Sequence, residues 1–163
     1  MNAIEPFAGH KPFMVVPGNH ETECHSLVCL NNPELITKLG NFSAYNNRFT
    51  MPSADSKGVK NMWYSFNYGP VHFITISAET DYPEAPNDTY VGKPLKSFGN
   101  QHKWLIADLE GALQHRKEQP FIVVSGHRPM YSSTSQENGK STGQASKLQE
   151  WLEPILVRRC RNI

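Results

Sequence analysis

The sequence predicts a layered α/β fold, because short apolar runs typical of strands alternate with amphipathic stretches typical of helices. One apolar run, Pro12 to Val16, stops at Pro17-Gly18, and another, Phe121 to Val124, stops at Ser125-Gly126. Runs of this length that Pro and Gly terminate are typical of buried strands. Neither run alternates apolar with polar residues, which indicates strands covered on both faces, as in a parallel sheet.

Two further strands are predicted between these runs, in a segment rich in aromatic and β-branched residues. They cover Trp63 to Tyr68 and Val71 to Ser77, and Gly69-Pro70 separates them. Aromatic and β-branched side chains fit the pleated surface of a sheet, and a Gly-Pro pair marks the turn. The stretches Asn41–Lys60 and Glu79–Gly99 are expected to be loops, because Pro, Gly, Asn and Ser are frequent in them.

Two helices follow from the spacing of apolar residues. Asn100 to Arg116 is the first, with Asn100 or Ser97 as the cap; Leu105, Leu109, Ala112 and Leu113 share one face, and Asp108, Glu110 and Gln114 point elsewhere. Ser146 to Val157 is the second, with Leu148, Trp151, Leu152 and Ile155 in register. Pro154 is expected to kink this helix or to start a new one, because a proline inside a helix costs about 3 kcal/mol.

Composition and charge narrow the class of protein. The chain has 163 residues, a net charge of +1, 19% charged and 38% hydrophobic residues, which is the balance of a globular domain. This charge predicts no nucleic-acid partner. No apolar run approaches the roughly 20 residues that would span a membrane, so no membrane span is expected. The first ten residues include Glu5 and lack an apolar core, so we do not expect them to be a signal peptide.

Cysteine usage leaves several alternatives open. Cys24 and Cys29 are close in sequence and could form a local disulfide, which would indicate an oxidising compartment, or remain two ordinary thiols. A zinc site of Cys24, His25 and Cys29 is a weaker alternative, since no second ligand pair follows at finger spacing. The sequons that begin at Asn41 and Asn87 favour a secreted glycoprotein.

Polar turns follow the two buried apolar runs, and both turns carry a histidine. The first turn is Gly18-Asn19-His20-Glu21, and the second is Ser125-Gly126-His127. If both strands are parallel, both turns lie at the same edge of the sheet, where ligand sites of α/β folds form. An amide oxygen and imidazole nitrogens together suit zinc, iron or manganese. The simpler alternatives are a structural turn at Asn19-His20 and a strand-end histidine at His127 that is bonded to backbone.

Two sequence blocks carry a family resemblance. Pro17 to Glu21 resembles the G-N-H-[DE] block of calcineurin-like metallophosphoesterases, and Val124 to His127 resembles their V-x-x-H block. The runs VSGHRPMY, from Val124 to Tyr131, and WYSFNYGPVHFI, from Trp63 to Ile74, are similar to purple acid phosphatases in particular. The resemblance extends from about Pro12 to Val157. It implies a metallophosphoesterase-type β-sandwich flanked by helices and incomplete at both ends, with residues 1–163 forming part of a catalytic domain.

The resemblance also implies roles for three residues. Asn19 and His127 would be ligands of the second, divalent metal of a dinuclear centre that pairs Fe with Zn, Mn or Fe. His20 would lie beside the phosphate and help to protonate the leaving group. Glu21 is a weaker candidate, for orienting His20. The reaction would be hydrolysis of phosphate monoesters at acidic pH by a hydroxide of the dinuclear centre.

Three blocks of the family pattern do not occur in this sequence. They are D-x-G, G-D-x-x-Y and the later G-H-x-H, which supply the remaining metal ligands. We therefore expect a fragment that carries only part of the ligand set, from a parent protein that is secreted or lysosome-like. Alone, it should expose the hydrophobic edge of Pro12–Val16, dissolve poorly and bind less than one tight metal ion. An inactive pseudo-enzyme that acts as a binding module, and a phosphodiesterase of the same superfamily, are the alternatives. The oligomeric state is not predicted.

Other histidines and aromatic residues are assigned to ordinary structure. His72 is expected to pack in the core, and His102 and His115 to be solvated on a helix. Arg128 could face the phosphate, although a surface position is the simpler interpretation. The expected aromatic core residues are Trp63, Tyr64, Phe66, Trp104 and Trp151.

Overall fold

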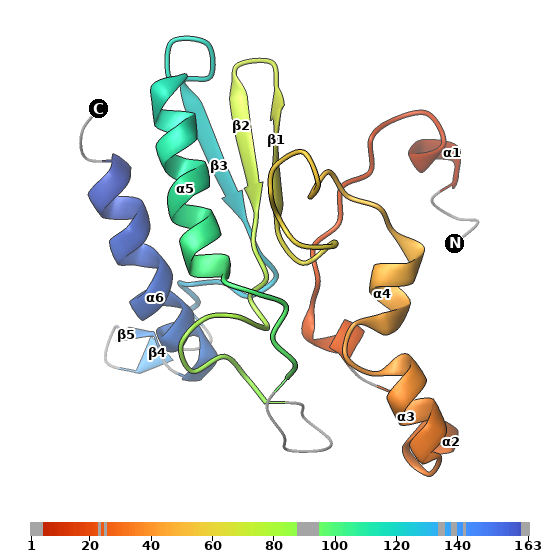
Figure 1. Ribbon diagram of the computed structural model, residues 1–163. Helices are drawn as coiled ribbons and strands as arrows, with labels where there is room; N and C mark the ends of the chain where they lie inside the picture. The colour runs from red at the N-terminus through yellow and green to blue at the C-terminus, as the bar shows by residue number, and fades with distance from the viewer. Residues whose placement is uncertain are drawn as a thin grey trace.

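Two long helices and a three-stranded sheet make up one half of the computed structural model, and short helices make up the other half (Figure 1). The structure describes residues 5–22, 24, 26–87, 95–133, 136–137, 140–141 and 143–160. Helices α5 and α6 lie at the β3 side of the sheet, and α1 to α4 lie beyond the β1 edge. The mixture of helices and strands confirms the α/β class.

The sheet has the order β1-β2-β3 and mixed strand directions. Strands β1 (Tyr64–Tyr68) and β2 (Val71–Thr75) form an antiparallel hairpin, while β2 and β3 (Phe121–Ser125) are parallel. Gly69 turns the hairpin with a φ of 55°, which is a left-handed conformation that glycine adopts without steric cost. All three strands lie where the sequence predicts them, and β2 and β3 end at the lower edge of the sheet in Figure 1.

The expected strand at Pro12–Val16 is wrong, because this segment joins no sheet. Its backbone groups bond to side chains instead of to a neighbouring strand. The carbonyl oxygen of Val15 accepts hydrogen bonds from the hydroxyls of Tyr64 (2.7 Å) and Tyr45 (3.3 Å). The Val15 N–H lies 3.5 Å from the sulfur of Met51. Burial raises the pKa of both tyrosines, so their hydroxyls keep the protons that they donate.

Strand β3 is covered on one face only, which corrects the expectation of a strand buried on both faces. Phe121 and Val123 are 61% and 44% exposed, whereas Ile122 and Val124 pack against the core. Phe66 lies on this open face in the strand register, stacked on Phe73 with a ring separation of 5.2 Å. It is half-buried and lies outside the buried core. The outer face of the sheet is therefore one exposed apolar surface of the described residues, and Phe13, 44% exposed, leaves apolar surface at Pro12–Val16 as well.

Helix α5 (Gln101–Gln114) covers the inner face of the sheet. Asn100 caps it, as predicted, by accepting a hydrogen bond from the Lys103 N–H at 2.9 Å. Asp108 was expected to point away from the packed face, yet its carboxylate accepts hydrogen bonds from Ser65 (2.5 Å) and His72 (2.9 Å) on the sheet. The predicted buried position of His72 is confirmed, and this polar cluster joins α5 to β1 and β2.

Helix α6 (Gly143–Cys160) continues through Pro154 as one element and does not restart there. It packs beside α5, where the indole N–H of Trp151 donates to the Nδ1 of His102 at 2.9 Å. His102 is exposed but is therefore not purely solvated. The buried core draws on both helices and on the hairpin; its largest fully buried side chains include Trp63, Tyr64, Phe42, Met62, Ile74, Ile76, Leu105, Leu109 and Leu148.

The short elements lie mostly before the sheet. They are α1 (Glu5–Ala8), η1 (Asn19–Thr22), α2 (Leu27–Leu30), α3 (Pro33–Leu39), α4 (Ser43–Arg48), β4 (Gln136–Glu137) and β5 (Lys140–Ser141). Helix α4 lies inside the stretch 41–60 that was expected to be loop, and Asn32 caps α3 through the N–H groups of Glu34 and Leu35.

A disulfide joins Cys24 to Cys29, which selects one of the three alternatives that the sequence left open. His25, the third member of the zinc alternative, lies outside the described residues. In the part of the chain that the structure describes, no helix is long and apolar enough to cross a membrane.

The tyrosine bonds to Val15 can be tested by removing a hydroxyl. We expect Tyr64→Phe to lower the free energy of unfolding by about 1 kcal/mol, because the partly buried Val15 carbonyl loses its shorter hydrogen bond. Tyr68→Phe is the matched control, since Tyr68 is 75% exposed, and it should change stability by less than about 0.5 kcal/mol. Urea unfolding of the three chains measures both values, and equal stabilities for all three would contradict this role of Tyr64.

Candidate active site

The first histidine-bearing turn is a short 3-10 helix, η1, that Glu21 and Thr22 hold in shape. The carboxylate of Glu21 accepts a hydrogen bond from the Gly18 N–H at 2.8 Å. The hydroxyl of Thr22 donates to the carbonyl oxygen of Asn19 at 2.7 Å. Glu21 thus stabilises the turn itself, and its predicted role in orienting His20 stays a prediction. The side chain of Asn19 is half-buried, and that of His20 is exposed.

The second turn follows β3 and packs tightly on the end of β2. A Cβ added to Gly126 would lie 3.1 Å from the Cγ1 of Ile76, closer than side chains normally approach. Glycine therefore lets the backbone of this turn lie directly on the core. The next residue, His127, is exposed at the edge of the sheet.

The two turns meet through the side chains of Asn19 and His127. Nε2 of His127 lies 2.9 Å from Oδ1 of Asn19, a hydrogen bond that spans 108 residues of sequence. The structure thus brings together the two side chains that the sequence pattern singled out as ligands of one metal. They meet although the segment before Asn19 is not a strand.

The glycine of the first turn, Gly18, explains how closely the turns approach. A Cβ on Gly18 would lie 2.9 Å from the Glu21 carboxylate and 3.1 Å from Nδ1 of His127. Any larger residue at this position would push against the imidazole or against the carboxylate that holds η1. The absence of a side chain at Gly18 therefore leaves the space that the His127 ring occupies.

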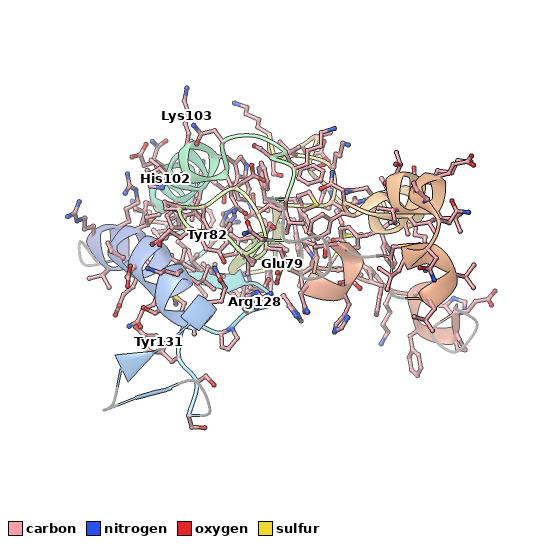
Figure 2. All side chains as sticks on the ribbon, turned by 90° about the horizontal axis from the view of Figure 1, so that it is seen from below. Glu79, Tyr82, His102, Lys103, Arg128 and Tyr131 are labelled. Carbon is pink, nitrogen blue, oxygen red and sulfur yellow. A yellow bond between two sulfur atoms is a disulfide. The ribbon has the colours of Figure 1, made fainter. Side chains whose placement is uncertain are left out.

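Arg128 is not an exposed surface residue, which corrects its expected surface position. It is also not free to reach a ligand with its whole guanidinium group. Its Nε and one terminal nitrogen donate to Glu79, with three N···O distances of 2.8–3.0 Å. The Glu79 side chain is 1% exposed, and that of Arg128 is 28% exposed. Figure 2, which views the molecule from below, shows the two side chains next to each other. Burial raises the pKa of Glu79, and the neighbouring charges of Arg128 and His127 oppose this effect.

Glu79 was missed from the sequence, where it appeared only as the first residue of a loop. It comes four residues after the end of β2, and β2 is the parallel neighbour of β3. An acidic residue at the carboxyl end of the strand beside β3 was the available signal, because such strand ends share one edge of the sheet.

The donor atoms of Asn19 and His127 fit two positions around one metal ion. Metal–ligand bonds of about 2.0–2.2 Å place neighbouring ligands roughly 3 Å apart, similar to the distance between these two atoms. Neutral imidazole and amide oxygen suit zinc, iron or manganese. Within the described ranges, no three His, Cys, Asp or Glu side chains lie close enough together to hold a metal ion. Asn19 and His127 would therefore supply only part of a coordination shell, and their role as ligands stays a prediction.

Comparison with known proteins places the chain among phosphoesterases. The calcineurin-like phosphoesterase family matches residues 1–156. Acid phosphatase type 7 of Homo sapiens is 35% identical over 94% of this chain and 28% of its own length. A probable inactive purple acid phosphatase 9 of Arabidopsis thaliana is 34% identical over 95% of this chain and 23% of its own length. The chain thus spans less than a third of these relatives.

A solved structure shows the same fold. A purple acid phosphatase from seeds of yellow lupin (Lupinus luteus) superposes with a TM-score of 0.57 and 21% sequence identity. The superposition covers 98% of this chain and 25% of the lupin chain. The fold is therefore that of a metallophosphoesterase, as the sequence predicted.

Gly18 provides a test of how closely the two turns must approach. We expect Gly18→Ala to lower the free energy of unfolding by about 1–3 kcal/mol, because the methyl group overlaps with Glu21 and His127. Gly111→Ala is the control: a Cβ there meets nothing within 4 Å, and alanine should stabilise α5 by about 0.5–1 kcal/mol. Urea unfolding measures both changes. A neutral or stabilising effect of Gly18→Ala would show that the turns do not pack this closely.

Proposed function

The chain belongs to the calcineurin-like phosphoesterase family, and on this premise we propose that it supplies part of the active site of an acid phosphatase that hydrolyses phosphate monoesters. The observation that supports this proposal is the meeting of Asn19 and His127 at one edge of the sheet. Both residues lie in the turns that the family resemblance selects. The proposal concerns part of a site, because the chain spans 28% of its human relative.

Asn19 and His127 would hold the divalent cation of a dinuclear centre that pairs iron with zinc, manganese or iron. When bound, such a cation polarises the phosphoryl group and activates water for attack on phosphorus. His127 would give up the proton on Nε2 to become a ligand, since only the lone pair of a neutral imidazole binds metal. Gly18 leaves space for its ring, and Glu21 keeps η1 in place so that Asn19 faces His127.

His20 would act on the substrate and not on the metal. It is exposed, and it lies next to Asn19 in the same turn. From this position its imidazole would donate a hydrogen bond to a phosphoryl oxygen and deliver a proton to the oxygen of the leaving group. Protonation of the leaving group by a positioned side chain contributes typically 10²- to 10⁴-fold to a rate.

A non-catalytic binding module is the second candidate. The Arabidopsis relative named as a probable inactive purple acid phosphatase matches 95% of this chain, so sequences of this kind include one that is named as inactive. Such a module would keep the fold and the meeting of the two turns without turnover.

The disulfide is the basis for our proposal about the cellular compartment of the protein. A Cys24–Cys29 bond persists in an oxidising environment, which supports a secreted or lysosome-like location for the protein. The sequon at Asn41 is compatible with glycosylation, since Asn41 is partly exposed. Residues 88 and 89 of the other sequon lie outside the described residues.

The metal assignment predicts how two alanine variants behave. We expect Asn19→Ala and His127→Ala each to weaken the binding of Zn²⁺ to the chain at least tenfold, as measured by isothermal titration calorimetry. The double variant should bind little worse than the weaker single variant, because both side chains hold one ion. His115→Ala, at the exposed end of α5, is the histidine control and should bind normally. Two Zn²⁺ ions bound per unaltered chain, with each single variant losing only one of them, would show two separate sites.

The catalytic assignment is tested in a chimaera that supplies the rest of a site. This chain replaces the matching segment of human acid phosphatase type 7, and hydrolysis of p-nitrophenyl phosphate is measured at acidic pH. We expect turnover in the chimaera, and His20→Ala should lower kcat by about 10²–10⁴-fold at unchanged metal content.

Three outcomes of the chimaera experiment would contradict parts of this proposal. A folded, metal-loaded chimaera without turnover would favour the binding module. Faster hydrolysis of bis(p-nitrophenyl) phosphate than of the monoester would favour a phosphodiesterase. Loss of metal in His20→Ala would make His20 a ligand.

A further inference from the structure

We propose that Glu79 is a positioning residue: it sets the direction of the His127 imidazole by holding Arg128, the next residue in the chain. The geometric part of this inference concerns the chain alone. Its consequence for metal affinity rests on the proposed function, in which His127 is a ligand. Neither residue carries a role in the family resemblance stated above.

The ion pair between Glu79 and Arg128 fixes the backbone on one side of His127. Three N···O contacts of 2.8–3.0 Å join the carboxylate to Nε and to a terminal nitrogen of the guanidinium group. A two-pronged contact of this kind restricts the orientation of arginine as well as its distance. Because the carboxylate is 1% exposed, water cannot replace the arginine without a large loss of electrostatic energy.

The loop that carries Glu79 is itself rigidly held. Gln101, at the start of α5, is fully buried, and its side-chain oxygen accepts a hydrogen bond from the Ser77 N–H at 2.6 Å. Its side-chain nitrogen donates to the carbonyl oxygens of Ser77 (3.0 Å) and Thr80 (3.2 Å). The position of Glu79 is therefore determined by α5 and the core, independently of the turn that it contacts.

The other side of His127 is fixed by packing. Gly126 lies on Ile76 and on Ala78, both of which are buried core residues. With Gly126 pressed on the core and Arg128 tied to Glu79, the backbone of His127 is restrained at both neighbours. The side chain between them is exposed, yet it reaches Asn19 with Nε2 at 2.9 Å. A buried ion pair next to an exposed ring is the arrangement expected of a support for that ring.

The simpler alternative is that the ion pair of Glu79 and Arg128 only stabilises the fold. A second buried pair in the same chain provides the control for this alternative. Asp108 and His72 join α5 to β2 and form a histidine–carboxylate contact of 2.9 Å with side chains 10% and 11% exposed. His72 is at the start of the parallel strands, whereas His127 follows their ends. Asp108→Asn therefore removes a buried carboxylate from the opposite end of the sheet.

The experiment compares Glu79→Gln with Asp108→Asn in the full chain, first without metal. NMR spectra of chains labelled with ¹⁵N in histidine and asparagine side chains report the His127 ring and the Asn19 amide. We expect Glu79→Gln to shift both sets of signals and to remove the contact between them. Asp108→Asn should leave these signals unchanged while it lowers the melting temperature.

A second readout is the affinity for Zn²⁺. Loss of a residue that supports a ligand typically weakens metal binding 10- to 100-fold, and we expect this loss for Glu79→Gln but not for Asp108→Asn. If Glu79→Gln does not fold, the double variant Glu79→Gln/Arg128→Met replaces it, because it leaves no unpaired buried charge. Arg128→Met should also shift the His127 signals, and the double variant should shift them no further, since Glu79 acts through Arg128.

The outcomes separate this proposal from the proposed function. Unchanged His127 signals in Glu79→Gln, or equal changes in Asp108→Asn, would overturn the positioning role, even if the chain binds Zn²⁺ through Asn19 and His127. Shifted His127 signals in a chain that binds no Zn²⁺ would support the positioning role and count against the metal site.

Discussion

The contact between the Asn19 amide oxygen and the His127 imidazole joins two turns that are 108 residues apart in the chain. Much of the surrounding structure serves to bring these two atoms together. Gly18 leaves room for the ring, Glu21 holds η1, and Gly126 lets the second turn lie on Ile76. As the proposed ligands of one cation, two donors that already lie together would spare that cation the cost of ordering two loops, which would otherwise be subtracted from its affinity.

Two buried carboxylates hold the layers of the fold at opposite ends of the sheet. Asp108 joins α5 to Ser65 and His72 near the hairpin turn, and Glu79 joins the loop after β2 to Arg128 near the candidate site. Neither carboxylate is exposed enough to be a surface ion pair of little energetic consequence.

Local sequence patterns predicted the elements whose bonds are local, and failed where the bonds come from distant side chains. The hairpin of β1 and β2, strand β3 and the cap of α5 at Asn100 follow from short patterns. The meeting of the two turns, 108 residues apart, was instead expected from the family resemblance and from a strand at Pro12–Val16 that the structure does not have. Pro12–Val16 has the composition of a strand. The carbonyl oxygen of Val15, however, accepts hydrogen bonds from the hydroxyls of Tyr45 and Tyr64, and no local sequence pattern predicts such bonds. The pairing of Glu79 with Arg128 spans 49 residues and was missed for the same reason.

The most direct test of a shared metal site is anomalous X-ray diffraction from crystals of the chain grown with Zn²⁺. We expect one anomalous peak at the edge of the sheet, within bonding distance of both Oδ1 of Asn19 and Nε2 of His127. A peak bonded to only one of these atoms, or a peak elsewhere on the molecule with none between them, would contradict the assignment of both residues to one cation.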